Sequence, residues 1–170
     1  MSIKQSIIDS VAYETRVIKH LATRVPDDAW DYRPSEGQRS TLELIQYLSR
    51  CGVVGMELLL SETRDRVKLL SAEGKETTRE TFAAEMDKQQ KMIEDMLAPL
   101  TDSDLLERRC KAPWQDEMPL LRGLIDVTIK FLACYRMQLF LYAKAAGAAN
   151  LTTSNSWGGR DREAPKPAAS

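Results

Sequence analysis

A single histidine, His20, limits the chemistry that this chain of 170 residues can carry. A Ser-His-Asp triad, a Cys-His pair and a histidine-bound metal would all have to use that one imidazole. A site with two histidine ligands cannot form within one chain. His20 lies late in an amphipathic segment, where a histidine interacts favourably with the C-terminal end of a helix. We therefore interpret His20 as a boundary residue.

The three cysteines, Cys51, Cys110 and Cys134, are odd in number and form no CxxC pair. This pattern predicts neither a disulfide framework nor a structural zinc site. Free cysteine commonly serves as a small, partly buried apolar residue. We expect free thiols in a reducing compartment.

Carboxylates are the remaining candidates for metal ligands. Bundles that hold two metal ions use inward glutamates and Glu-x-x-His pairs, and no such pair occurs here. The most plausible inward acids are Glu43, Glu57 and Asp126. Ion pairing with neighbouring basic residues is the interpretation that we favour for them. The sequence also contains no phosphate-binding glycine loop and no HExxH motif.

The elements that must position these residues are long amphipathic helices. Apolar residues recur at steps of three and four, the pattern of a helix with one buried face. Ser40 and Glu43 form a capping-box pattern, and Thr77 and Glu80 form a second. Gly52 and Gly55 inside the second helix indicate close approach of a neighbouring helix or a ligand. The predicted helices span about residues 3–24, 40–60, 78–98 and 120–146.

These helices predict an all-α protein, an antiparallel four-helix bundle formed by residues 1–159. Trp30 and Tyr32, in the connector before the second helix, are expected to cover one end of the core. Residues 61–77 are polar, and we expect them to connect the second and third helices. Trp157 is expected to dock back onto the bundle, and residues 160–170 are expected to form a flexible tail.

Composition excludes several classes of partner. The net charge is −1, and no basic block marks a nucleic-acid or membrane surface. No apolar run approaches the ~20 residues that a bilayer-spanning helix needs, and the first residues lack the apolar core of a signal peptide. We expect a cytoplasmic protein that binds neither nucleic acid nor membranes.

Several stretches together resemble the DinB/YfiT-like superfamily. Residues 25–34 (VPDDAWDYRP) are similar to the connector after that family's first helix, and residues 40–48 (STLELIQYL) to the start of its second. The stretch 100–105 (LTDSDL) resembles the segment after the third helix, and 135–139 (YRMQL) resembles part of the last. The resemblance covers about residues 3–159. It implies a four-helix bundle that often dimerises, and for some members a thiol-dependent transferase or isomerase activity.

The resemblance also implies where a metal would lie. Many members bind a divalent metal through three histidines, and the corresponding positions here are Tyr47, Phe131 and Tyr135. Phenylalanine cannot coordinate a metal, and a phenol with a pKa near ~10 is a poor ligand at neutral pH. We therefore expect no metal and no cofactor. The three aromatic rings should instead meet at the bundle centre, with Gln138, Arg136 or Glu43 as partners for the hydroxyls.

Two main functions follow from this interpretation. The first is a homodimeric, non-catalytic bundle that binds a small molecule or a partner protein at a pocket formed by Tyr47, Phe131, Tyr135, Glu43 and Gln138. The alternative is a thiol-dependent transferase or hydrolase-like enzyme that uses tyrosine or cysteine groups, such as Cys134, in the same pocket. An oligomerisation module without a ligand is a third possibility.

Overall fold

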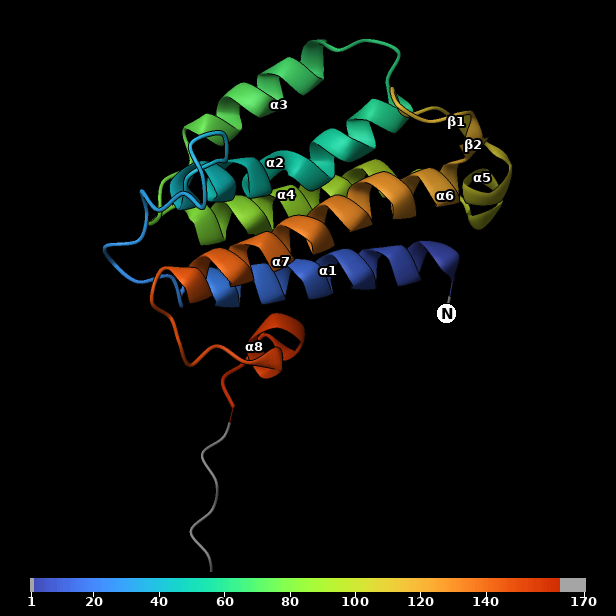
Figure 1. Ribbon diagram of the computed structural model, residues 1–170. Coiled ribbons are helices and arrows are strands. Elements are labelled where there is room, and N and C mark those ends of the chain that lie inside the picture. Colours follow the sequence, from blue (N-terminus) through green and yellow to red (C-terminus); the bar gives the residue numbers. More distant parts are fainter. Residues whose placement is uncertain (1, 163–170) are drawn as a thin grey trace, which may run out of the picture.

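The computed structural model describes residues 2–162, and within them a four-helix bundle forms the body of the protein (Figure 1). Helices α1 and α7 run in one direction, and α2 and α4 run in the other (Figure 1). The prediction of an all-α bundle is confirmed. No helix within residues 2–162 is long and apolar enough to cross a membrane. The bundle helices are α1 (Ile3–Ala22), α2 (Thr41–Leu60), α4 (Phe82–Leu97) and the continuous run of α6 (Leu120–Gly123), η1 (Leu124–Ile129) and α7 (Lys130–Ala145).

A further helix, α3 (Asp65–Lys75), lies within the segment that we expected to be a polar connector. Only Leu70 and Gly74 of this helix are buried. A stripe of one leucine and one glycine is too weak to reveal a helix by its periodicity. Gly74 lies so close to α2 that a Cβ atom there would be 2.9 Å from the Gln46 carbonyl oxygen. Helix α3 therefore packs tightly along the outer face of α2.

The glycines of α2 allow neighbouring helices to approach, as predicted. A Cβ atom on Gly52 would lie 3.2 Å from Ile93 Cδ1 of α4, and one on Gly55 would lie 3.1 Å from Val127 Cγ1 of η1. The predicted capping box of Ser40 and Glu43 is also present.

The second predicted capping box is wrong. Helix α4 begins at Phe82, after Thr81, and its N-cap makes no side-chain hydrogen bond. Thr78 and Thr81 instead satisfy each other, because each backbone N–H donates to the other residue's hydroxyl. The buried Phe82 fixes this start, since the turn before it is exposed.

The side chain of Gln89 in α4 is inserted into the hydrogen-bond ladder of α2. Its Oε1 accepts from the backbone N–H of Gly52 at 2.7 Å, and its Nε2 donates to the Leu48 carbonyl at 2.9 Å. In a regular helix those two backbone groups would bond to each other. Such an insertion is a recognised cause of helix bending, and α2 changes direction near its middle (Figure 1).

The long fourth helix contains a π-helical turn, η1, between α6 and α7. Val127 and Thr128 of this turn are buried, and they face Gly55 of α2. The predicted helix at about 120–146 is therefore present as one run, with an irregular turn in its first half. π-helical turns occur frequently at functional sites.

Short elements close the end of the bundle near the α6 N-terminus. They are α5 (Asp102–Glu107), β1 (Arg109–Cys110) and β2 (Met118–Pro119). The two strands are antiparallel, with Cys110 opposite Met118. The Asp102 carboxylate accepts from the backbone N–H groups of Ile3 and Lys4, both at 2.9 Å, and so covers the exposed donors at the start of α1.

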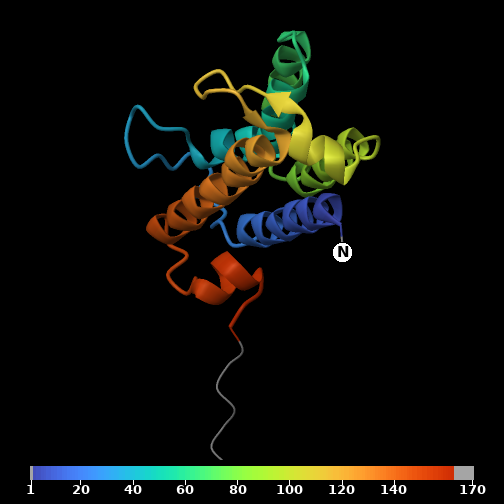
Figure 2. The same ribbon diagram turned by 90° about the vertical axis from the view of Figure 1, so that its right-hand side faces the viewer.

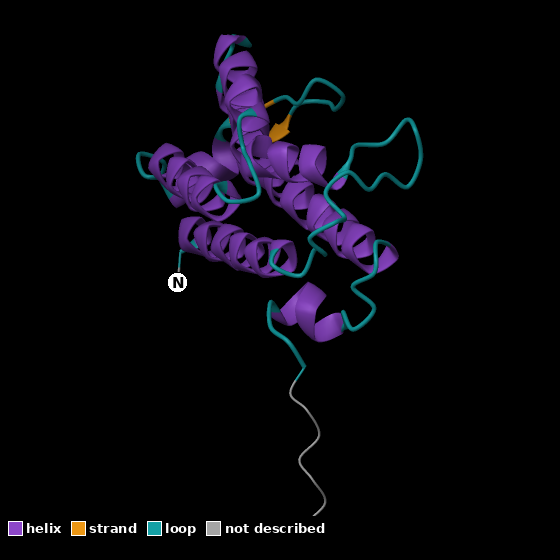
Figure 3. Cartoon of the chain, turned by 90° about the vertical axis from the view of Figure 1, so that its left-hand side faces the viewer, coloured by secondary structure: helices purple, strands orange, loops and turns teal. Residues whose placement is uncertain are grey.

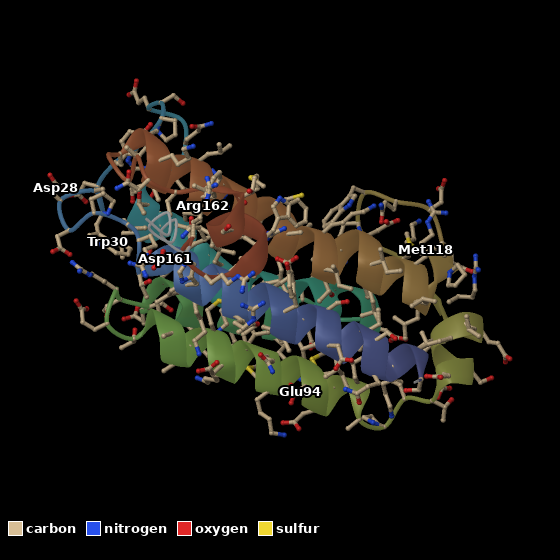
Figure 4. All side chains as sticks on the ribbon, turned by 90° about the horizontal axis from the view of Figure 1, so that it is seen from below. Asp28, Trp30, Glu94, Met118, Asp161 and Arg162 are labelled. Atoms are coloured by element: carbon tan, nitrogen blue, oxygen red, sulfur yellow. The ribbon has the colours of Figure 1, made fainter. Side chains whose placement is uncertain are left out.

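Helix α8 (Thr153–Gly158) lies across α1 and α7, as seen from below in Figure 4. Its final carbonyls accept hydrogen bonds from three side chains: Ser156 from Arg136, Trp157 from the Tyr13 hydroxyl, and Gly158 from Arg16. Under α8, Arg136 and Glu14 form a buried ion pair with Nε and Oε2 2.7 Å apart.

The predicted docking of Trp157 takes a different form. Trp157 is 56% exposed, with the Arg136 guanidinium 4.7 Å from its ring centroid. The buried residues of α8 are Asn155 and Ser156. The backbone and these polar side chains therefore attach α8, because the carbonyls at the end of a helix need donors.

His20 lies at the boundary of the bundle, as predicted, and contacts the segment after α8. Its Nε2 is 3.1 Å from Asn155 Nδ2 and 3.8 Å from an Asp161 carboxylate oxygen. Asp161 also pairs with Arg24, so this part of the predicted tail contacts both α1 and the turn that follows it. In Figure 4, Asp161 lies at the same end of the molecule as Trp30. Residues 163–170 lie outside the described part of the chain.

The environment of His20 predicts a loss of stability in mild acid. Burial lowers the pKa of the imidazole, although Asp161 opposes that shift. When folding lowers the pKa of a histidine, the folded state has its full stability above the ordinary pKa of that residue. As the pH falls through the lowered pKa, the unfolded state binds the proton more readily, and the free energy of unfolding decreases. Between about pH 7.5 and about pH 5.5, the melting temperature should fall more for the wild type than for His20→Gln. An equal fall in both proteins would contradict the prediction.

Candidate functional site

Four aromatic side chains form a row along the contact between α2 and α7. The Tyr47 and Tyr135 ring centroids are 4.6 Å apart, and those of Tyr135 and Phe131 are 6.4 Å apart, both edge to face. Trp114, from the loop between the strands, stacks on Phe131 at 5.9 Å. The structure thus brings the three predicted aromatic residues together. They are half-buried at the side of the bundle and not at its fully buried centre.

Two loops flank this row. The loop of residues 31–39 and the loop of residues 111–117 project on the same side of the bundle in both end views (Figures 2 and 3). The first loop places the guanidinium of Arg39 4.2 Å from the Tyr47 ring centroid and 5.8 Å from that of Tyr135. Sequence reasoning missed Arg39, and its one available signal was a basic residue directly before the N-cap Ser40.

A cleft of about 590 Å³ lies beside Tyr47, between α2 and α3. Its volume falls within the usual range for small-molecule sites. Of the predicted pocket residues, Tyr47 and Glu43 line this cleft, whereas Phe131 and Tyr135 belong to the neighbouring aromatic row. The lining residues are Arg39, Glu43, Gln46, Tyr47, Arg50, Cys51, Val54, Ser71, Gly74 and Lys75.

The acidic group of the cleft is already paired. Both oxygens of Glu43 accept from Arg33, at 2.7 and 2.8 Å, and one also accepts from the Ser40 N–H at 2.9 Å. These hydrogen bonds, first the one from Arg33, lower the pKa of Glu43 to about 2. Glu43 is therefore ionised and occupied by its own partners at neutral pH.

The buried cation of the cleft is paired as well. Arg50 forms an ion pair with Glu85 of α4, and its Nε lies 3.6 Å from a Glu73 oxygen of α3. In contrast, neither Arg39 nor Lys75 forms an ion pair with any carboxylate among residues 2–162. The cleft therefore carries two positive charges that form no ion pair within the described residues, and Arg39 acts on the paired Glu43 only at longer range.

Three residues of the cleft lining, Tyr47, Cys51 and Val54, carry no charge, and we call them the floor of the cleft. Burial raises the pKa of the Cys51 thiol. Burial also raises the pKa of the Tyr47 phenol, and the neighbouring Cys51 and Tyr135 side chains add to that shift. Both groups thus remain protonated at neutral pH. Val54 adds an aliphatic surface beside them.

The remaining predicted residues lie elsewhere. Gln138 Nε2 donates to the Tyr142 hydroxyl at 2.7 Å, and Arg136 faces Glu14. Neither gives Tyr47 a partner. Glu57 pairs with Arg66 at 3.5 Å.

The third candidate acid and the exposed thiol are also outside the cleft. Asp126 pairs with Lys130 at 2.5 Å and with Arg122 at 3.2 Å. Cys134 is exposed. Arg136 cannot activate it, because residues two apart on a helix project about 200° apart and Arg136 is buried against α1.

Comparison with known proteins agrees with this architecture. A family model described as the DinB superfamily matches residues 13–161. The chain belongs to the DinB superfamily. The fold is also similar to a crystal structure described as a member of the DinB family, from Exiguobacterium sibiricum 255-15, with a TM-score of 0.69 and 19% identity over 86% of this chain and 93% of that one. No curated protein matches this DinB-superfamily chain.

The residues present in this DinB-superfamily chain do not fit the three-histidine metal centre that the family resemblance implies. Phe131 has no donor atom, and burial keeps the Tyr47 phenol protonated. Tyr135 packs its ring directly against Tyr47. Within residues 2–162, no group of three or more His, Cys, Asp or Glu side chains is placed to hold a metal ion.

Proposed function

We propose that this DinB-superfamily protein is a non-catalytic bundle that binds a small organic molecule in the cleft between α2 and α3. The observation that carries the proposal is the cleft itself, about 590 Å³ in volume, with Tyr47, Cys51 and Val54 on its floor. Small-molecule sites are typically concave, mostly apolar and lined by a few polar groups.

The protonation states of the floor support binding rather than catalysis. A nucleophilic cysteine needs a lowered pKa, and burial shifts the pKa of Cys51 in the opposite direction. A general acid near neutral pH needs a pKa close to that pH, and burial moves the pKa of Tyr47 further away. The homodimer stays a prediction, which sedimentation at several concentrations would check.

Filling the cleft tests this proposal. The neutral fluorescent probe N-phenyl-1-naphthylamine should bind the wild-type protein saturably, at one site per chain. Val54→Trp should weaken that binding at least about tenfold, because the larger ring occupies the floor. Leu141→Trp, on the exposed face of α7, is the matched control and should bind the probe like the wild type.

Circular dichroism will establish that both variants keep their helical content. The proposal is overturned if the wild type shows no saturable binding. It is equally overturned if folded Val54→Trp binds as tightly as the control.

A further inference from the structure

We propose that the ligand is an organic anion, in which a carboxylate, sulfonate or phosphate group binds Arg39 and Lys75 while an apolar body occupies the floor of the cleft. This inference rests on the proposed function, since it names the chemical class of the molecule in the same cleft.

The balance of charge in the cleft is the first observation that favours an anionic ligand. Glu43 is neutralised by Arg33, and Arg50 is neutralised by Glu85 and Glu73. Arg39 and Lys75 remain without an acidic partner among residues 2–162. Positive groups at the edge of a low-dielectric cleft attract an anion more strongly than the same groups on an open surface.

The placement of Arg39 is the second observation that favours an anionic ligand. Its guanidinium lies 4.2 Å from the centroid of the Tyr47 ring, and this contact restrains a side chain that is otherwise exposed. A guanidinium held over a ring has more N–H groups than that contact uses, and the remaining ones match two oxygens of one anionic group.

Lys75 gives weaker support than Arg39. It stands in the last turn of α3, where a cation also interacts favourably with the helix dipole. Its contribution to the cleft is a point charge, which suits a carboxylate and a phosphate equally.

The uncharged floor is the third observation, and it favours a ligand with an apolar body. Cys51 and Tyr47 carry no charge at neutral pH, because burial raises both pKa values. A fully charged ligand would have to lose its hydration there without compensation. The geometry therefore favours a molecule with one anionic end and one apolar end.

Two probes that share one ring system separate the charge from the apolar body. The anionic probe is 8-anilinonaphthalene-1-sulfonate, and N-phenyl-1-naphthylamine is its uncharged counterpart. We expect the wild type to bind the sulfonate at least about tenfold more tightly. Arg39→Gln and Lys75→Gln should each weaken binding of the sulfonate, Arg39→Gln by about tenfold, and should affect binding of the neutral probe much less.

Arg108→Gln is the matched control. It removes an exposed positive charge at the end of α5, at the opposite end of the bundle from the 31–39 loop (Figure 1). It should bind both probes like the wild type. Octanoate and octyl phosphate should each displace the sulfonate probe more effectively than octanol, and their ranking will distinguish carboxylate from phosphate ligands.

Failure of this inference differs from failure of the proposed function. If both probes bind equally and Arg39→Gln affects them equally, the cleft binds molecules without selecting anions, and the inference is overturned alone. If neither probe responds to Val54→Trp, the cleft is not a binding site and both proposals fail.

Discussion

Replacing Arg136 by methionine will lower the free energy of unfolding by about 3–5 kcal/mol, because it leaves the Glu14 carboxylate buried without its partner. Glu14 and Arg136 are 7% and 2% exposed, so water cannot take the place of the guanidinium. Arg136 also donates to the Ser156 carbonyl, so α8 loses one of its attachments. Urea unfolding followed by circular dichroism will measure the loss.

The loss should depend on pH. Burial already raises the pKa of Glu14, and Arg136 opposes that shift. Without Arg136 the pKa of Glu14 rises further, so the variant can relieve the cost by protonation as the pH falls. The loss in free energy of unfolding of Arg136→Met, relative to the wild type, should therefore be larger at about pH 8 than at about pH 5.

The double variant Glu14→Leu/Arg136→Met is the control for this prediction. It removes both charges together and should be more stable than Arg136→Met alone, since a buried pair replaced by apolar residues often costs little. A single variant that loses less than about 1 kcal/mol would show that the pair is solvated in solution.

Replacing Gln89 by alanine will cost about 2–3 kcal/mol, because it removes the hydrogen bonds that repair the interrupted ladder of α2. The Gly52 and Val53 N–H groups would lose their shared acceptor, and the Leu48 carbonyl would lose its amide donor and keep only the weak one from the Cys51 thiol among the described residues. Gln89 is 1% exposed, so a cavity would replace it. Thermal unfolding and amide hydrogen exchange of residues 52 and 53 will measure the effect.

Gln90→Ala is the matched control. Gln90 is the next residue in the chain, and within residues 2–162 its amide donates only to Glu94 one turn away. Its loss should cost less than about 0.5 kcal/mol. A Gln89→Ala variant as stable as Gln90→Ala would show that α2 restores its own hydrogen bonds by straightening.

The number and places of the bundle helices could be predicted because each buries a repeating apolar stripe. Residues such as Ile7, Val11, Ile18 and Leu21 of α1 follow that spacing and are buried. Helix α3 escaped prediction because one of its two buried residues is a glycine. Periodicity detects apolar side chains, whereas Gly74 packs closely against α2 because it has no side chain.

The candidate site could be predicted only in part. Tyr47, Phe131 and Tyr135 were identified through the family resemblance, and they do meet. The cleft beside Tyr47 depends on α3, so it could not be foreseen without that helix. Arg39 also lies in a loop, and no periodicity shows which ring such a residue will contact.

The contacts of α8 join positions that are 142 and 144 residues apart in the chain. A growing polypeptide contains Glu14 for roughly ten seconds or more before it contains α8, whose Ser156 carbonyl accepts from the Arg136 that pairs with Glu14. The apolar residues of α1, α2 and α4 are therefore synthesised while the Glu14 carboxylate still lacks its partner Arg136. Long-range contacts of this kind form late, because ordering the chain between them costs entropy first. We therefore expect the attachment of α8 to be a late step of folding, one that converts a hydrated charge pair into a buried one.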